Sequence, residues 1–368
     1  MAVFKLQLTT LSPLHIGDGI ELRQDFDFIV NNEKTYRLDE NAILEAKYAE
    51  LQVRPGAAYT LPGKLLTTVE DYRTSKFFRY VLPGKPRSSL TDARLRSCLK
   101  DVHDWPYIPG SSLKGALRTA LGWSGWDEVI TNLDRSSFGT RDKWAGQPLE
   151  KKLFGKDPNH DLLRALQVSD CQTIGDNRAR MILVNAQVLT HSNHGSPIEL
   201  EAISPNQIFE GRLHIDERLF GSLAEPELGF AKHRHWLDEL LPRINRRSQG
   251  RLEKLVPWFE SVPECEVIAN FLRKLQAAEM GENKAILQMG WGTGWDGTTF
   301  GSHLQKNPDL FETLVREFRM NKPGRTAPPR RPGSPFPSSR RVAVKMAGNT
   351  AHPAAPLGWV LMELEKIS

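Results

Sequence analysis

The chain has 368 residues, of which 39% are hydrophobic and 25% charged, a composition typical of a soluble globular protein. No apolar run approaches the roughly 18 residues that a membrane span needs, so we expect no membrane partner. The start, MAVFKLQLTT, has no apolar core or cleavage site of a signal peptide. Cys98, Cys171 and Cys265 are odd in number and widely separated, which excludes a disulfide framework or a Cys-x-x-Cys zinc site and favours a reducing, cytoplasmic location.

The net charge of +5 is concentrated in one segment of the sequence. Residues 321–345 hold seven Lys or Arg residues and no acid, so the rest of the chain sums to −2. Six prolines in the same segment exclude a helix or a central strand and predict a mobile, solvated loop. We interpret this loop as one that can also lie along phosphate, with Arg330, Arg331, Arg340 and Arg341 as candidate RNA contacts.

In chain order, alternating and helical hydrophobic patterns follow one another throughout the sequence. Strands are predicted at 2–11, 25–30, 93–102, 163–170, 180–189, 197–203, 207–216, 285–289 and 358–364. Helical spacing occurs at 39–53, 65–81, 111–121 and 308–319, and over 226–281, where Pro242, Pro257 and Pro263 predict a division into three pieces. Strand–helix–strand pieces with hairpins predict an α+β fold of the split βαβ, ferredoxin-like type.

The stretch YIPGSSLKGALRTAL, residues 107–121, predicts a helix whose first turns bind phosphate. Ser111 or Ser112 is expected to cap the helix, and its free N–H groups favour anions. Lys114 and Arg118 are spaced i,i+4 on one face, and Gly115 between them removes a side chain that would keep a backbone away. The alternative is a capped helix with leucines in the core and solvated cations.

The glycine cluster GWGTGWDGTTFG, residues 290–301, predicts a loop at which a nucleic-acid backbone approaches closely. Gly290, Gly292 and Gly294 are the candidate contacts, beside two tryptophans that are equally well explained as core residues. Residues 292–297 match G-x-G-x-x-G, but no strand–helix–strand unit follows, so a dinucleotide site is only a distant alternative.

The first loop, PLHIGDG, places His15 and Gly17 directly after the first strand. His15 with Asp18 or Asp25 is a candidate acid–base pair, although a histidine in a glycine turn is more often structural. No P-loop, H-E-x-x-H or G-x-S-x-G motif is present, and we expect neither a metal nor a cofactor.

The order of these three motifs resembles the RAMP superfamily of CRISPR-associated proteins. The PLHIG loop follows the first strand, IPGSSLKG lies near residue 110, and GWGTGW lies toward the C-terminus. The chain length, the helical block at 226–281 and the closing PLGWVLMEL are similar to one family within it, the fifth subunits of type III-A (Csm) effector complexes. The motifs cover about a tenth of the chain, but their order spans nearly all of it.

The resemblance implies a ferredoxin-like, RRM-like core with helical insertions and a second, smaller C-terminal ferredoxin-like part. We expect a RAMP domain at 1–220, a helical insertion at 221–283, and a C-terminal part at 284–368. The implied partners are crRNA and neighbouring RAMP backbone subunits of the Csm complex, with host nucleases recruited for crRNA 3′-end maturation. The resemblance gives phosphate contacts to His15–Gly17, Ser111, Ser112, Lys114, Arg118 and the three glycines of the cluster.

The leading hypothesis is therefore a non-catalytic subunit that caps the complex at the 3′ part of the guide. Related backbone subunits cut target RNA with an aspartate in the loop after the first strand, but no flanking motif here selects Asp18 or Asp25. The alternative is an endoribonuclease of the same superfamily that acts through His15 or one of these aspartates.

Overall fold

The computed structural model describes residues 2–47, 60–87, 92–175, 178–191, 194–320, 330–348 and 350–367. The strands in these residues are β1 Ala2–Thr10, β2 Gly17–Arg23, β3 Phe28–Asn31, β4 Lys34–Leu38, β5 Phe78–Pro83, β6 Arg94–Cys98, β7 Leu166–Val168, β8 Gln172–Thr173, β9 Met181–Leu189, β10 His194–Ile203, β11 Ile208–Ile215, β12 Lys284–Gln288, β13 Arg340–Ala347, β14 Thr350–Ala355 and β15 Trp359–Lys366. The α-helices are α1 Glu40–Lys47, α2 Val69–Arg73, α3 Gly110–Ser124, α4 Trp126–Val129, α5 Gln147–Phe154, α6 Glu225–Leu228, α7 Arg234–Asp238, α8 Leu240–Glu260, α9 Glu266–Ala277, α10 Trp295–Thr298, α11 Gly301–Leu304 and α12 Pro308–Glu317. Short 3-10 turns are η2 Pro62–Leu65, η3 Ser75–Phe77, η4 Arg135–Ser137, η5 Asp142–Trp144, η6 Pro158–His160, η7 Leu162–Arg164, η8 Glu217–Phe220 and η9 Phe230–His233.

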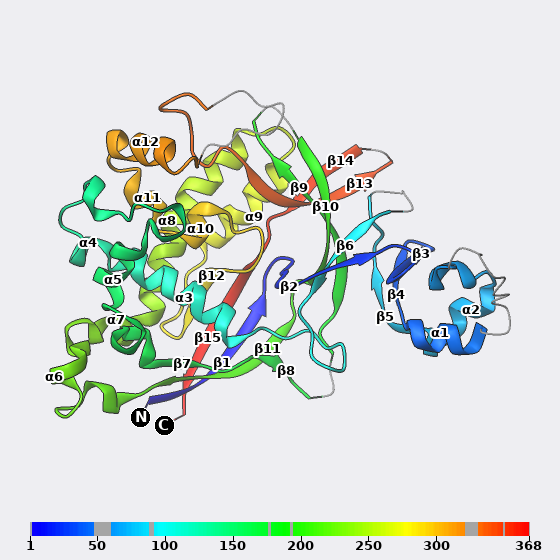
Figure 1. The fold of residues 1–368 in the computed structure, drawn as a ribbon, viewed down its shortest axis with the longest axis horizontal. Helices are drawn as coiled ribbons and strands as arrows, with labels where there is room; N and C mark the ends of the chain where they lie inside the picture. Colours follow the sequence, from blue (N-terminus) through cyan, green and yellow to red (C-terminus); the bar gives the residue numbers. More distant parts are fainter. Residues whose placement is uncertain are drawn as a thin grey trace.

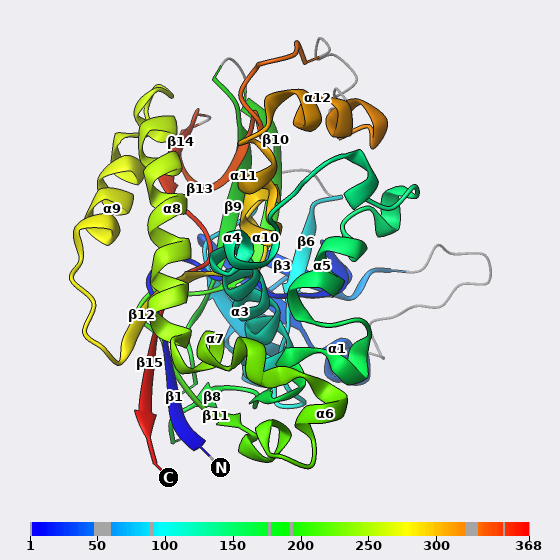
Figure 2. The same ribbon diagram turned by 90° about the vertical axis from the view of Figure 1, so that its left-hand side faces the viewer.

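The first sheet joins the two ends of the chain. Its order is β12-β15-β1-β11-β7, with β8 also paired to β11, and each neighbouring pair is antiparallel. In β1 the side chains of Leu6 and Leu8 alternate with more exposed neighbours and are fully buried. Helices α3 and α8 pack on each other, α3 against β7 and α8 against β12 (Figures 1 and 2).

The free edge of this sheet is covered by side chains of α8. The Asn245 amide donates to the carbonyl of Lys284 and accepts from the amide of Ile286, and Ser248 Oγ donates to the Ile286 carbonyl. These bonds replace those of a neighbouring strand and leave β12 unavailable for pairing with another chain.

The second sheet has the order β14-β13-β9-β10-β6-β2. Its pairs are antiparallel except β10 with β6, which run parallel. The strands of 284–368 thus divide between the two sheets, β12 and β15 in the first and β13 and β14 in the second. The domain boundaries at 220 and 283 and the second ferredoxin-like part stay predictions.

A small lobe projects from the main body, to the right in Figure 1. It consists of the three-stranded sheet β3-β4-β5 with α1 and α2, and it has a core of its own. The core residues are Ile29, Leu38, Ile43, Leu65, Leu66 and Phe77.

The sequence predicted the mixed α+β class and most strands, but three expectations were wrong. Of 65–81, only 69–73 is α-helical, and 78–83 is strand β5. Helix α8 runs through Pro242 and Pro257. Pro242 lies in the first turn, where a backbone N–H has no partner within the helix, and Pro257 lies in the last turn, where few residues of the helix follow it. Only Pro263 separates two helices. The end of 321–345 belongs to β13, an interior strand, because all the prolines precede it.

Two further observations bear on the compositional expectations. Among the described helices, none combines the length and apolarity needed to cross a bilayer. The three cysteines are free and buried, and burial raises the pKa of the Cys98 and Cys265 thiols to about 11 and that of Cys171 to about 12. These thiols are therefore un-ionised core groups at neutral pH.

Candidate nucleic-acid interface

Helix α3 begins at Gly110 and has no side-chain cap of its own. Its N-cap position is Pro109, so the prediction that Ser111 or Ser112 caps the helix is wrong; both serines lie inside the first turn. The amide of Gly110 instead donates to Asp170 Oδ1 at 2.8 Å. A Cβ at Gly110 would lie 2.2 Å from the carbonyl oxygen of Val168, so the helix starts pressed against the end of β7. A carboxylate of the chain itself therefore binds the first free N–H of the helix, one of the groups that we predicted to bind phosphate.

One turn further along α3, the predicted residues Lys114, Gly115 and Arg118 line a hollow of about 490 Å³. The remaining walls come from α5 and from the segment between Gly155 and Arg164. A Cβ built on Gly115 would meet no atom within 4 Å, so the hollow is open at this point. We call this the Lys114 hollow.

Arg118 forms a fixed wall of the Lys114 hollow. Its Nη1 donates to Asp161 Oδ2 at 2.6 Å and its Nη2 to Glu150 Oε2 at 3.3 Å. Its guanidinium carbon lies 4.0 Å from the centre of the Phe154 ring. Two carboxylates thus balance the charge of Arg118, and its stacking holds the guanidinium in place.

The lysines of the Lys114 hollow carry the uncompensated charge. Lys114, Lys151 and Lys156 line it and form no salt bridge with any residue that the structure describes. The acids nearby serve other bonds: Asp157 caps η6, and Asp161 caps η7 and pairs with Arg118. Burial lowers the pKa of half-buried Lys114, against a raising effect of Asp161. A cation that is partly desolvated and unpaired favours an incoming anion.

Lys151 and Lys156 were missed by the sequence reasoning. They belong to EKKLFGKD, a short basic run after a weakly patterned stretch. The signal was three lysines within six residues around a glycine, but only the packing of α5 beside α3 brings them to Lys114.

The two glycine-rich loops, each of which we predicted to contact RNA, meet in the interior. The Trp291 amide donates to the His15 carbonyl at 2.8 Å, and a Cβ on Gly290 would lie 2.7 Å from the same oxygen. Gly290 has φ +78°, a conformation that favours glycine. The backbone at Gly290 is thus dictated by contact with the first loop. We call this contact the His15–Gly290 junction.

The His15 ring lies in the core, 2% exposed. Its Nδ1 lies 2.6 Å from the Glu201 carbonyl oxygen, which fixes the ring, and burial lowers its pKa. Gly17, at the start of β2, is exposed beside it. The ring of His15 therefore supports the loop from within, whereas Gly17 lies at the surface.

Glu201 is a fully buried carboxylate beneath the His15–Gly290 junction. It accepts bonds from Tyr80 Oη at 2.7 Å, Lys100 Nζ at 2.5 Å and the Cys98 amide at 2.9 Å. Burial and the charge of Glu201 raise the pKa of Tyr80. This network ties β10 to β6 and to the small lobe.

The glycine cluster itself is held by arginines. Arg251 lies 3.6 Å and Arg340 3.7 Å from the Asp296 carboxylate, and Arg247 donates to the Asp296 carbonyl. Gly292 has φ +97° and packs on Leu357. Gly294, the third predicted contact, has φ +76°, and a Cβ there would meet only the Asp296 side chain, at 3.6 Å. Because β12 runs antiparallel to its neighbour β15, this loop is no βαβ turn, and the dinucleotide alternative has no structural support.

One aromatic ring of the cluster is flanked by cations. Trp291 is half-buried, and the guanidinium carbons of Arg96 and Arg341 lie 5.7 and 5.2 Å from its ring centre. Arg341 is exposed. An aromatic ring with an exposed guanidinium beside it is a surface on which single-stranded nucleic acid can stack.

The four predicted arginines of the Pro-rich segment divide into two kinds. Arg330 donates to both oxygens of Glu312 at 2.8 Å, and Arg340 is tied to the glycine cluster, so both serve the fold. Arg331 and Arg341 are exposed. Lys322 and Arg325 lie outside the described residues.

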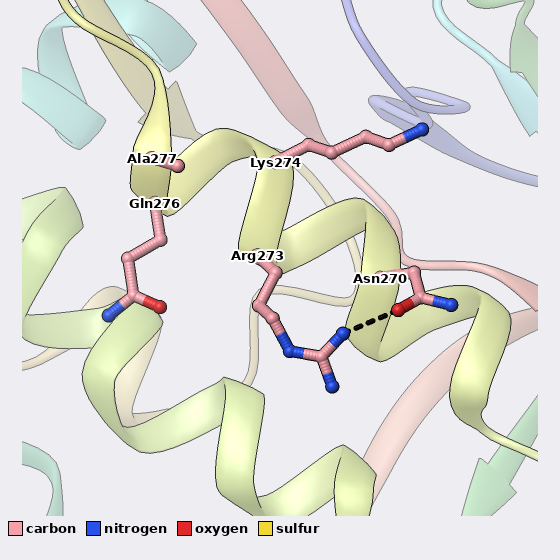
Figure 3. Close-up of a pocket in the computed structure, with 5 residues that line it drawn as sticks. All are labelled: Asn270, Arg273, Lys274, Gln276 and Ala277. Carbon is pink, nitrogen blue, oxygen red and sulfur yellow. Dashed lines mark hydrogen bonds between the residues drawn. The ribbon is translucent and has the colours of Figure 1, made fainter.

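A separate hollow on the outer face of α9 contains none of the predicted residues (Figure 3). It is lined by Asn270, Arg273, Lys274, Gln276 and Ala277. Arg273 donates to Asn270 Oδ1 at 2.5 Å and to Glu260 Oε1 at 2.6 Å, so part of its charge is already balanced. Lys274 on this surface is therefore a control position for lysine variants of the Lys114 hollow.

His15 and Asp18 do not form an acid–base pair. Asp18 accepts from the Ile20 amide at 2.8 Å and from Ser97 Oγ at 2.7 Å, while His15 bonds to Glu201. No cluster of three His, Cys, Asp or Glu side chains among the described residues is placed to hold a metal ion.

Comparison with known proteins identifies the family. Residues 7–295 match the RAMP superfamily. CRISPR system Cms protein Csm5 of Streptococcus thermophilus is 31% identical over 252 residues, 61% of this chain and 67% of that protein. Csm5 of Methanocaldococcus jannaschii is 26% identical over 380 residues, covering 96% of this chain and 87% of that protein.

Two solved structures share the fold. A chain in a cryo-EM structure of a Csm–crRNA–target RNA ternary complex of a type III-A CRISPR-Cas system aligns with a TM-score of 0.68 at 22% identity, covering 98% of this chain and all of that one. The crystal structure of T. onnurineus Csm5 aligns with a TM-score of 0.62 at 22% identity, covering 96% and 99%. The chain therefore belongs to the RAMP superfamily and, within it, to the Csm5 family.

Proposed function

We propose that this chain is a crRNA-binding subunit of a type III-A Csm effector ribonucleoprotein in antiviral defence. Family membership supports the complex, because a neighbour of the same fold was solved within a Csm–crRNA–target RNA assembly. Neighbouring RAMP subunits and crRNA are then its partners, and the cytoplasm its location. The observation that carries RNA binding in this chain is the Lys114 hollow, where three lysines without salt bridges in the described structure surround a glycine with open space above it.

We also infer that the first sheet contains the ferredoxin-like unit of the RAMP fold. Four of its strands lie side by side in the order β15-β1-β11-β7. Numbered one to four along the chain, these strands have the order 4-1-3-2. Helix α3 lies between the first and second of these strands, and α8 between the third and fourth. In this assignment β12 is an additional strand at the edge, and the Lys114 hollow lies on the first helix of the unit.

The proposed subunit is non-catalytic, and the geometry of the first loop is the reason. A general base must reach the proton that it removes, whereas the His15 ring is buried and bonded to a backbone carbonyl. Asp18 is engaged by a serine and an amide on its own sheet. The endoribonuclease alternative would require this loop to open.

Binding of a short fluorescent single-stranded RNA at two salt concentrations tests RNA binding. We expect the double variant Lys114→Ala/Lys151→Ala to weaken binding at least tenfold and to reduce the slope of log affinity against log salt by about 1.4, because two phosphate contacts are lost. Lys232→Ala/Lys274→Ala removes the same charge from exposed positions elsewhere, one of them on the α9 hollow, and should leave the affinity near that of the wild type. Equal losses in the two double variants would contradict a site at the Lys114 hollow.

The same samples on a denaturing gel test catalysis. We expect the RNA to stay intact; cleavage that disappears in His15→Ala would favour the endoribonuclease. The role at the guide's 3′ part is tested in the assembled complex by the lengths of crRNA 3′ ends. We expect longer, unprocessed ends with the Lys114→Ala/Lys151→Ala chain, reflecting lost support for host nucleases.

A further inference from the structure

A second hollow lies directly beside the Lys114 hollow and differs from it in chemistry. It encloses about 380 Å³ between α3, α5, α10, α11 and α12. Its lining includes five aromatic side chains: Trp126, Phe138, Trp295, Phe300 and Phe318. We call this the aromatic hollow. Its size suits one small planar group.

The aromatic walls are fixed by packing. A Cβ on Gly301 would lie 1.9 Å from Trp295 Cη2, so the indole rests directly on the backbone there. Trp126 stacks on His303 with ring centres 5.0 Å apart and planes 9° apart, and Phe300 leans on Trp126 at 5.8 Å. Phe300 and Trp295 remain half-buried. The hollow therefore offers ring surface that does not have to be ordered when a ligand enters.

The two hollows share a wall. Arg118 and Glu150 line both of them, and the contacts of Arg118 with Asp161 and Phe154 hold this wall in place. A ligand lying across the wall meets lysines on one side and aromatic rings on the other. A phosphate attached to a planar aromatic group has this division of chemistry, and so does each residue of single-stranded RNA.

Polar groups at the rim suit the edge of a base. Thr119 donates its hydroxyl to a backbone carbonyl, which leaves its oxygen as an acceptor. Thr299 donates in the same way, and its oxygen also accepts from the Gly301 amide at 3.1 Å. The Glu150 carboxylate accepts, and the Arg118 guanidinium donates. Base edges carry both donors and acceptors.

We propose that the aromatic hollow receives one unstacked nucleobase of the RNA whose phosphates lie on the Lys114 hollow. The proposal rests on the proposed function and adds a base contact to phosphate binding. The occupant that it rejects is an apolar side chain of a neighbouring protein subunit, because a purely apolar group would use the aromatic rings but not the lysines across the shared Arg118–Glu150 wall.

Gly146 provides a way to fill the aromatic hollow without disturbing the fold. It lines the hollow, it is exposed, and a Cβ built on it meets no atom within 4 Å. Its φ of −84° is acceptable to any residue. Gly146→Trp therefore blocks the hollow, and Gly146→Ala at the same position is the matched control that leaves it open. Thermal melting checks that both variants fold as the wild type does.

The probes are a fluorescent single-stranded RNA of about ten nucleotides and an abasic ribose-phosphate oligomer of the same length. We expect the wild type and Gly146→Ala to bind the RNA about tenfold more tightly than the abasic oligomer, because one stacked base is worth roughly that much. Gly146→Trp should lose this preference and keep its affinity for the abasic oligomer. Lys114→Ala/Lys151→Ala should weaken the binding of both probes.

The outcomes separate this inference from the proposed function. If Gly146→Trp binds RNA as tightly as Gly146→Ala while the lysine variant loses affinity, the base site is wrong and the phosphate site stands. If the lysine variant binds as the wild type does, both are wrong. If Gly146→Trp binds RNA normally but no longer co-purifies with neighbouring Csm subunits, the hollow holds a protein side chain, and the inference is overturned.

Discussion

Gly115 and Gly290 show how differently two glycines in candidate RNA-binding motifs are used. A methyl group on Gly115 would enter open space above the Lys114 hollow. The same group on Gly290 would lie 2.7 Å from the His15 carbonyl oxygen. The first glycine leaves room for something outside the chain, whereas the second leaves room for the chain itself.

The charges around the two sites differ in the same way. At the Lys114 hollow, lysines stand without salt bridges among the described residues, and burial lowers the pKa of Lys114. At the His15–Gly290 junction, the buried charge of Glu201 is matched by Lys100 and by donors from Tyr80 and Cys98. Unmatched charge marks a place for a ligand, and matched buried charge marks a place that holds the fold.

The largest expected effect comes from breaking the junction at Glu201. Glu201→Gln removes the charge opposite Lys100 and should lower the free energy of unfolding by about 3 kcal/mol, because it leaves a buried ammonium without its partner. Thermal or urea unfolding followed by circular dichroism measures it. Glu210→Gln breaks the exposed pair with Lys5 and should destabilise the fold far less. Similar losses in the two variants would mean that the junction does not depend on this charge.

The sequence was sufficient for the parts of the molecule that depend on local patterns. Alternation located β1, β9, β11 and β15, and i,i+3/i+4 spacing located α3 and α12. It also placed Lys114 and Arg118 on one face of a helix with Gly115 between them, and the structure brings all three to one hollow. The α+β class followed from the same patterns.

The parts that failed depend on residues far apart in the chain. The cap of α3 is Asp170, sixty positions from Gly110, and no local rule indicates it. His15 is buried because β10 and the glycine cluster both contact it, through the Glu201 carbonyl and the Trp291 amide. From the sequence we predicted Arg118 and Arg340 as RNA contacts, because their carboxylate partners, Asp161 and Asp296, are far away along the chain. Tertiary pairing decides which charges remain for a ligand.

A pH dependence of stability tests the contact between α3 and α11. His303 donates from Nε2 to the Trp123 carbonyl, and burial lowers its pKa to about 4. Between pH 6.5 and about 4, the unfolded chain binds a proton that the folded chain does not, so stability falls as the pH falls. From pH 7.5 to 5 this amounts to about 2 kcal/mol.

His303→Gln keeps an amide donor near the Trp123 carbonyl but does not titrate. Its unfolding midpoint should therefore fall less than that of the wild type between pH 7.5 and 5, while His352→Gln, at an exposed position, follows the wild type. The comparison stays above pH 5 because the carboxylates of Asp71, Glu128 and Asp216, with pKa values near 2, lose their stabilising charge only in stronger acid. Parallel midpoints for all three proteins would contradict the role of His303.

Two alanine substitutions test whether a methyl group is tolerated at Gly115 and not at Gly290. Gly115→Ala should raise the free energy of unfolding by about 0.5–1 kcal/mol, because the position is inside a helix and has room. Gly290→Ala should lower it by about 2 kcal/mol, through the positive φ and the contact with His15. Denaturant unfolding of both variants measures the difference in sign. Two destabilised variants would show that the space above Gly115 is closed in solution.

The smallest expected effect distinguishes two exposed arginines in different surroundings. Arg341 stacks beside Trp291, whereas Arg331 is exposed in the Pro-rich segment. If the flanked Trp291 ring forms part of the RNA surface, Arg341→Ala should weaken RNA binding about threefold and reduce the salt slope by about 0.7, with a change in stability below about 0.5 kcal/mol. Arg331→Ala removes the same charge without the stacking partner and should change affinity less. Equal losses in both variants would instead assign the effect to the general positive charge of the segment.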